Sequence, residues 1–280
     1  MSEGMMIKDI LVRLERDARR DAVNEVAVSL AELFDAHLTG VSFTDERVLE
    51  VSLAQLPLDV VQRISSEAEE AAQASIDRFA RLSEPRLSSV AHRLIGESDL
   101  SPAKAFAHMA RCFDVSVVMQ PDPDASVDDA QVIEAALFES GRPIIAVPYI
   151  QRQGVVLDQV VCCWDGGRAA ARAIGDALPL LKKARNVRVL TIANDSSDLN
   201  ECRGLEIGAH LARHGVKIDV EVTSAPDVDV ADTILNWVAD QSASMLVMGG
   251  YGHSRLREFV LGGVTRTMLS SMTVPVFLSH

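Results

Sequence analysis

The amino-acid sequence predicts an α/β protein made of two tandem domains, each a doubly wound parallel sheet. The first observation is that short apolar runs alternate with longer segments whose apolar residues recur at helical spacing. The second is that the pattern repeats, because residues 7–12 align with 157–162 and residues 38–42 with 188–192 at a common offset of 150. We therefore expect residues 1–150 and 151–280 to be two copies of one domain.

Each copy is expected to open with a strand, a helix and a second strand. Apolar residues at helical spacing follow the first strand of each copy, and the chain then returns to an apolar run. In the first copy these positions are Ala22, Val26, Ala27, Leu30 and Leu33, and in the second they are Ala170, Ile174, Ala177, Leu178 and Leu181. Such a unit makes parallel strands joined by a right-handed crossover.

The remaining elements follow in the same order in both copies. In the first copy we expect a helix near 59–82, a strand at 88–94, a helix at 101–112 and strands at 115–119 and 144–147. In the second copy the corresponding segments are 199–214, 216–223, 230–240, 245–248 and 274–278. The break in the apolar pattern at 148–156 marks the seam between the copies.

Composition and charge exclude several classes of function. With 48% hydrophobic residues, the 280-residue chain can form two packed cores. A net charge of −13 without a basic stripe argues against a nucleic-acid partner. No apolar run approaches the length of a membrane span and no signal peptide precedes Ile7, so we expect a cytoplasmic protein with no membrane partner.

The cysteines do not predict a metal site. Cys112, Cys162, Cys163 and Cys202 lie at spacings that match no zinc pattern. We expect them to be reduced core residues.

A glycine-rich segment follows the apolar run 245–248. It contains Gly249, Gly250 and Gly252, and then Gly262, Gly263, Val264 and Thr265. Glycines let backbone N–H groups approach an anion, and a second glycine pair opens a helix whose N-terminus attracts negative charge. The alternative is that these glycines only make tight turns at the edge of the sheet.

The spacing of Gly249, Gly252 and Gly262 resembles the C-terminal signature of the universal stress protein family. In that family the motif binds the ribose and phosphates of ATP. Gly263 departs from the signature, because the family has a serine or threonine there whose hydroxyl contacts the phosphates. The resemblance covers both copies and implies two tandem, Rossmann-like domains. It implies ATP as the ligand, with Mg²⁺ possible beside it. The alternatives to ATP are AMP, a cyclic nucleotide or an apolar metabolite.

The resemblance also assigns roles outside the glycines. Asp165 would contact the adenosine, or would cap the following helix instead. Ile192 and Met248 would be apolar walls around the adenine, or ordinary core residues. Thr265 would contact a phosphate or cap its own helix. The nucleotide-binding residues predicted in this way are Asp165, Ile192, Met248, Gly249, Gly252, Gly262, Gly263, Val264 and Thr265.

The first copy is expected to have lost this site. Gln120, Pro123 and Ala130 stand where the glycines would be, and proline lacks the N–H that a cradle needs. Glu15 replaces Asp165. The aspartates that follow are interpreted as a solvated acidic loop rather than a cation site; they are Asp122, Asp124, Asp128 and Asp129. The second copy alone is therefore expected to account for nucleotide binding.

No catalytic motif accompanies the glycines: the chain has no Gly-Lys-Ser/Thr phosphate loop, Gly-x-Ser-x-Gly elbow or His-Glu-x-x-His site. We expect a regulator or protective factor that binds adenine nucleotide. A nucleotide-free scaffold for protein association and a slow ATPase are the alternatives.

The final strands of the copies, near 142–147 and 273–278, are expected to pair within the chain as a pseudo-dimer, and a homodimer is left open.

Overall fold

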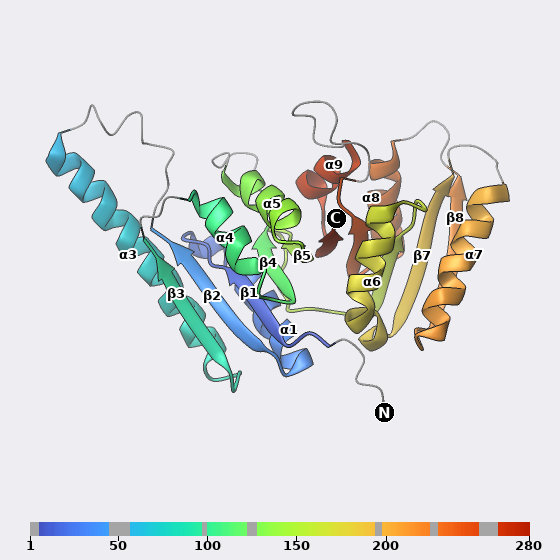
Figure 1. Cartoon of the computed structure of the whole chain (residues 1–280), viewed down its shortest axis with the longest axis horizontal. Helices are drawn as coiled ribbons and strands as arrows, with labels where there is room; N and C mark the ends of the chain where they lie inside the picture. The colour runs from blue at the N-terminus through green and yellow to red at the C-terminus, as the bar shows by residue number, and fades with distance from the viewer. Residues whose placement is uncertain are drawn as a thin grey trace.

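The computed structural model describes residues 6–44, 57–96, 100–121, 128–193, 198–224, 229–251 and 263–280. Within these residues a ten-stranded sheet runs through the whole molecule in the order β3-β2-β1-β4-β5-β10-β9-β6-β7-β8, and helices cover both of its faces (Figure 1). The two halves have the same strand order, read outward from the centre. The predicted doubly wound α/β fold is confirmed.

The elements of the first half are β1 (Asp9–Arg13), the short 3₁₀ helix η1 (Ala18–Arg20), α1 (Ala22–Phe34), β2 (His37–Phe43), α3 (Leu58–Ser83), β3 (Val90–Ile95), α4 (Pro102–Ala110), β4 (Val115–Met119), α5 (Asp128–Glu139) and β5 (Ile144–Val147). Those of the second half are β6 (Gln159–Cys163), α6 (Arg168–Lys183), β7 (Asn186–Ala193), α7 (Asp198–Arg213), β8 (Ile218–Ser224), α8 (Val230–Asp240), β9 (Met245–Gly249), α9 (Gly263–Ser271) and β10 (Val276–Ser279).

The strand register corrects the alignment of the two copies in one place. Val12 lies opposite Gly40 in the first half, and its equivalent Cys162 lies opposite Val189 in the second. Gly40 therefore corresponds to Val189, one residue from the alignment that the sequence suggested. β2 is buried on both faces, so its residues show no alternation that could fix the register.

The two halves join through their last strands, as expected from the sequence. β5 and β10 pair antiparallel, with Ile145 opposite Phe277. Every other strand pair in the described sheet is parallel. The buried side chain of Gln120 adds a second link, because its Nε2 donates to the carbonyl oxygens of Leu269, at 2.9 Å, and Ser270, at 3.1 Å. Gln120 thus satisfies carbonyl groups at the end of α9.

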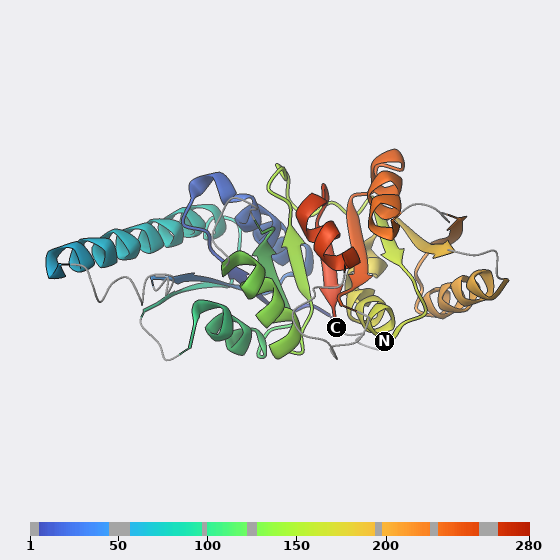
Figure 2. The same cartoon turned by 90° about the horizontal axis from the view of Figure 1, so that it is seen from above.

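Two hydrophobic clusters lie on the two faces of the sheet, and each contains residues of both halves. One joins Leu30 and Phe34 of α1 to Ile174 and Leu180 of α6. The other joins α4 and α5 to α8 and α9 (Figure 2). The sequence suggested one core for each copy. The structure has one core for each face, because the β5–β10 pairing makes the sheet continuous.

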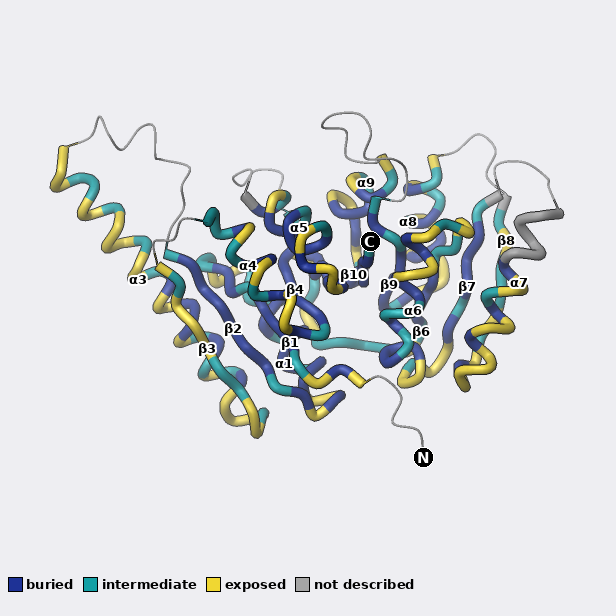
Figure 3. Tube along the Cα trace, in the orientation of Figure 1, coloured by how far each residue is buried: buried dark blue, intermediate teal, exposed yellow. Residues whose placement is uncertain are grey.

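Burial falls toward the outer ends of the molecule. The central strands are buried, whereas the first turns of α3 are largely exposed (Figure 3).

Cys162 is buried as predicted, but Cys112 is exposed after the end of α4, so the prediction of a core residue was wrong there. The side chain of Cys202 lies outside the described residues. In the part of the chain that the structure describes, no helix is both long and apolar enough to cross a bilayer.

Cleavage of the chain between Gln151 and Gly154 is expected to leave the two fragments associated at micromolar concentration. The β5–β10 pairing and both clusters cross the junction, so most of the contact between the halves does not depend on the connecting segment. Size-exclusion chromatography after insertion of a protease site measures this. Fragments that elute separately while keeping their circular dichroism would show that the halves are only tethered.

Candidate functional site

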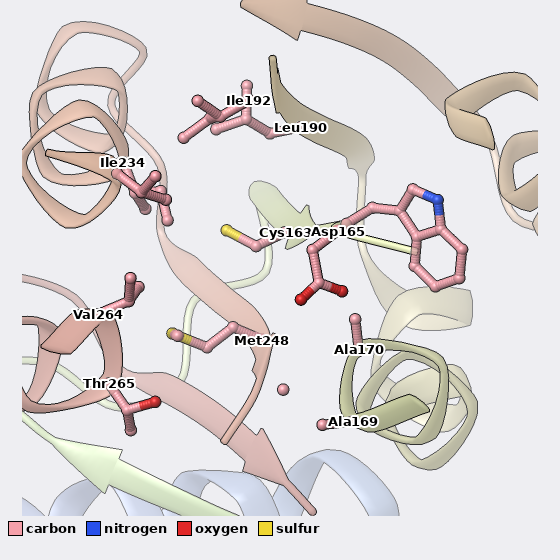
Figure 4. A pocket seen from close by; sticks show the side chains of 13 residues that line it. Cys163, Asp165, Ala169, Ala170, Leu190, Ile192, Ile234, Met248, Val264 and Thr265 are labelled. Carbon is pink, nitrogen blue, oxygen red and sulfur yellow. The ribbon is translucent and has the colours of Figure 1, made fainter. Parts of the chain in front are cut away.

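A cavity of about 270 Å³ lies at the carboxyl edge of the second half, between α6, α8 and α9 (Figure 4). It lies where β6, β7 and β9 end, the edge at which doubly wound parallel sheets bind ligands. Its walls are mostly apolar and include Leu190, Ile192, Ile234 and Met248. The side chains of Asp165 and Thr265 add polar groups at two sides.

The structure brings most of the predicted nucleotide-binding residues together at this cavity. The predicted residues that line it are Asp165, Ile192, Met248, Gly249, Val264 and Thr265. Gly263 is the first residue of α9, and a Cβ built on it would meet no neighbouring atom of the described residues within 4 Å. Gly252 and Gly262 lie outside the described residues. Nucleotide contact by these residues stays a prediction.

The sequence did not predict a ligand-binding role for several residues that line the cavity. Cys163 and Trp164 end the apolar run of β6, and Leu190 and Ile234 follow ordinary strand and helix patterns. Nothing in the sequence distinguishes such residues from the core. Burial raises the pKa of the Cys163 thiol to about 12, and the charge of Asp165 raises it further. The thiol is therefore neutral at physiological pH and forms part of the apolar wall.

Asp165 shapes the turn between β6 and α6. Its Oδ1 accepts a hydrogen bond from the backbone N–H of Gly167, at 2.7 Å, while Gly166 has a positive φ of 74°. Gly167, not Asp165, is the N-cap residue of α6, so the alternative role of Asp165 as the helix cap is wrong. The carboxylate is fixed by this turn and points into the cavity (Figure 4).

Thr265 connects the two described ends of the glycine motif. Its buried Oγ1 accepts a hydrogen bond from the backbone N–H of Tyr251, at 3.1 Å. A hydroxyl that accepts one hydrogen bond still has its own hydrogen to donate. Thr265 can therefore close the motif and donate to a ligand at the same time.

Gly249 has a packing role that is independent of any ligand. A Cβ at this position would lie 2.5 Å from the backbone nitrogen of Ala170 and 2.6 Å from the carbonyl carbon of Ala169. Only glycine lets the end of β9 pack this closely against the first turn of α6.

Tyr251, two residues further along, has a positive φ of 55°. This left-handed conformation costs a residue with a side chain about 1–3 kcal/mol and persists only where the surroundings impose it. Burial raises the pKa of the Tyr251 hydroxyl, and the charge of Glu134 raises it further. The Tyr251 phenol is therefore neutral at physiological pH.

In the first half, ion pairs occupy the corresponding position. Arg13 and Glu15 stand where Cys163 and Asp165 stand in the second half, and their side chains lie 2.9 Å apart. Asp129, in the first turn of α5, lies 2.7 Å from Arg20 and 3.3 Å from Arg13. Asp129 is only 7% exposed, so its interpretation as part of a solvated loop was wrong. Asp122, Pro123 and Asp124 lie outside the described residues, as does the side chain of Asp128.

The sheet register also corrects the comparison of the two halves at the glycine motif. Met119 lies opposite Val147, and Gly249 lies opposite Ser279. The next N–H groups, those of Gln120 and Gly250, then donate to the carbonyl oxygens of Val147 and Ser279. Met119 is therefore the equivalent of Gly249, and Gln120 is the equivalent of Gly250.

Comparison with known proteins agrees with this architecture. Residues 157–280 match the model of the universal stress protein family. The second half is a universal stress protein domain. A universal stress protein from Synechocystis sp. is 23% identical over 137 residues, which are 48% of this chain and 46% of that protein. The match thus spans about half the length of this curated relative.

Solved structures resemble the whole chain in fold. The crystal structure of a universal stress protein from Archaeoglobus fulgidus has a TM-score of 0.76 at 15% identity, and the likeness covers 99% of this chain and 98% of that one. A protein of unknown function from Pseudomonas aeruginosa has a TM-score of 0.64 at 14% identity, over 98% and 92% of the two chains. The fold of the universal stress proteins therefore extends over both halves.

Proposed function

We propose that the second half binds ATP or a related adenine nucleotide, and that the protein is a cytoplasmic regulator or protective factor in the stress response. The first half is then a second domain of the same family that has lost its site. The observation that carries the proposal is the cavity itself, in which apolar walls, a fixed carboxylate and the N-terminus of a helix face one space.

The lining can hold each part of such a ligand. Ile192, Met248 and the other apolar walls suit the face of an adenine ring. The Asp165 carboxylate is an acceptor for ribose hydroxyls. The N-terminus of α9 and the hydroxyl of Thr265 are donors for phosphate oxygens, with Mg²⁺ balancing the charge of ATP. These local donors do not conflict with a net charge of −13, because they act at short range.

One observation favours a different function, that of a nucleotide-free scaffold for protein association. Packing against α6 already explains the glycine at position 249, so this glycine does not by itself require a phosphate. A scaffold would keep the cavity empty in the cell.

Mass spectrometry of small molecules released from the natively purified protein by heat separates the two functions. We expect an adenine nucleotide among the released compounds. We also expect added ATP to change the fluorescence of Trp164, which lines the cavity, and a Trp164→Phe variant to lose that change. A protein that releases no nucleotide and shows no Trp164 response to ATP would support the scaffold.

Replacement of Gly263 with serine is expected to tighten ATP binding. Among the described residues, a Cβ at this position meets no neighbouring atom within 4 Å, so we expect a small steric cost. The new hydroxyl can donate a hydrogen bond to a charged oxygen, which strengthens binding on the order of tenfold. Calorimetric titration measures this, and Gly263→Ala, which adds the Cβ without the hydroxyl, is the matched control. A serine variant that binds ATP no better than the alanine variant would place the phosphates elsewhere.

A further inference from the structure

The start of the glycine motif contacts the other half of the molecule. A Cβ built on Gly250 would lie 2.5 Å from Cδ2 of Leu137, so the backbone of Gly250 packs directly under this α5 side chain. The next residue of α5, Phe138, has its ring centroid 4.9 Å from that of Tyr251. Two consecutive residues of the first half therefore contact two consecutive residues of the motif.

The last two residues of the chain contact the same segment. The N–H of Gly250 donates to the carbonyl oxygen of Ser279, at 2.8 Å, and the carbonyl oxygen of Gly250 lies 2.9 Å from Nδ1 of His280. The ring of His280 also contacts the ring of Phe138 edge-on, with centroids 4.9 Å apart. Gly250 thus contacts both α5 and the last two residues of the chain, and Tyr251 packs against α5.

One hydrogen bond connects these packing contacts of Tyr251 to the cavity. The backbone N–H of Tyr251 donates to Oγ1 of Thr265, and Thr265 lines the cavity. Tyr251 makes this bond from a left-handed backbone conformation, which a residue with a side chain adopts only under constraint. The packing of its ring against Phe138 supplies such a constraint.

We propose that the first half of the chain positions the nucleotide site of the second half, with Phe138 as a positioning residue that acts through Tyr251 on Thr265. This inference rests on the proposed function. The residues that contact the ligand all belong to the second half, but the packing that orders the phosphate end of the site comes from both. The loss of a cradle in the first half thus leaves that half with a role in binding.

The test compares ATP with adenosine, using the full-length chain and calorimetry. ATP binding is expected to depend on Thr265 at the phosphate end of the site. Adenosine binding is expected to depend on Asp165 and the apolar walls of the cavity. Phe138 is not one of the residues that line this cavity. Phe138→Leu is expected to weaken ATP binding roughly tenfold and to leave adenosine affinity within about twofold of wild type. Phe138→Tyr, which keeps the ring, is expected to bind ATP as wild type does.

Two further variants sharpen the result. Tyr251→Leu should weaken ATP binding as much as Phe138→Leu does, and the double variant should be no weaker than either, because both changes remove one contact. Phe113→Leu is the matched control: Phe113 is a buried aromatic residue of the first half that precedes the amino end of β4, and it is expected to leave ATP affinity unchanged.

The outcomes distinguish the inference from the function on which it rests. A wild-type chain that binds neither ATP nor adenosine overturns the proposed function, and the positioning role with it. If wild type binds ATP, three results overturn the positioning role alone: unchanged ATP affinity in Phe138→Leu, a parallel loss of ATP and adenosine, or an equal loss of ATP affinity in Phe113→Leu.

Discussion

Replacement of Gly249 with alanine is expected to lower the free energy of unfolding by about 3 kcal/mol, the upper range for overpacking of a close contact. The added Cβ would lie 2.5 Å from the nitrogen of Ala170 and 2.6 Å from the carbonyl carbon of Ala169. Both are backbone atoms in the first turn of α6, so no side-chain rotation can relieve the clash. Either α6 or the end of β9 must move, and both belong to the packed sheet.

Gly175→Ala is the matched control for this experiment. Gly175 lies in α6, and a Cβ there meets no neighbouring atom within 4 Å in the part of the chain that the structure describes. Because alanine favours a helix over glycine, this variant is expected to gain roughly 0.5–1 kcal/mol. Urea denaturation of both variants gives the comparison. A Gly249→Ala protein as stable as wild type would mean that packing does not require this glycine, and would strengthen the case that a ligand does.

Replacement of Glu15 with glutamine is expected to cost about 3–5 kcal/mol of stability, the range for removing one partner from a buried ion pair. Glu15 is 5% exposed and pairs with Arg13, at 2.9 Å, and with Arg20, at 3.4 Å. Without its charge, the two guanidinium groups lose one carboxylate partner and keep Asp129. Glutamine keeps the shape of the side chain, so the loss reports on the charge.

An exposed ion pair of the same half provides the control. Glu32 lies 2.6 Å from Arg86, and hydrogen bonds from Arg86 lower the pKa of Glu32. Both side chains are well exposed, so Glu32→Gln is expected to cost less than about 1 kcal/mol. Equal losses for Glu15→Gln and Glu32→Gln in urea denaturation would contradict the structural importance of the buried cluster.

The sequence predicted the alternation of strands and helices because apolar runs record burial directly. It missed α5 because the first residues of this helix are aspartates, which also favour loops and turns. Asp129 is buried because Arg13 and Arg20, more than 100 residues earlier in the chain, balance its charge. Such a contact leaves no local signal in the sequence.

Much of the candidate site could also be predicted from the sequence, but its contacts with remote segments could not. The resemblance to the universal stress protein family indicated Asp165, Met248 and Thr265, and all three line one cavity in the structure. The sequence could not show that Gly249 is required by α6, nor that Phe138 packs against Tyr251. Both depend on the distance between segments that are remote in the chain.

The number of ATP molecules bound by one full-length chain tests the central claim most directly. Calorimetric titration is expected to give one site per chain, because the cavity of the second half is available whereas side chains of Arg13, Glu15 and Asp129 occupy the corresponding place in the first. We expect Asp165→Ala to weaken that site. The claim that the second half alone binds adenine nucleotide would be contradicted by two sites per chain. It would also be contradicted if neither ATP nor any other adenine nucleotide bound at millimolar concentration.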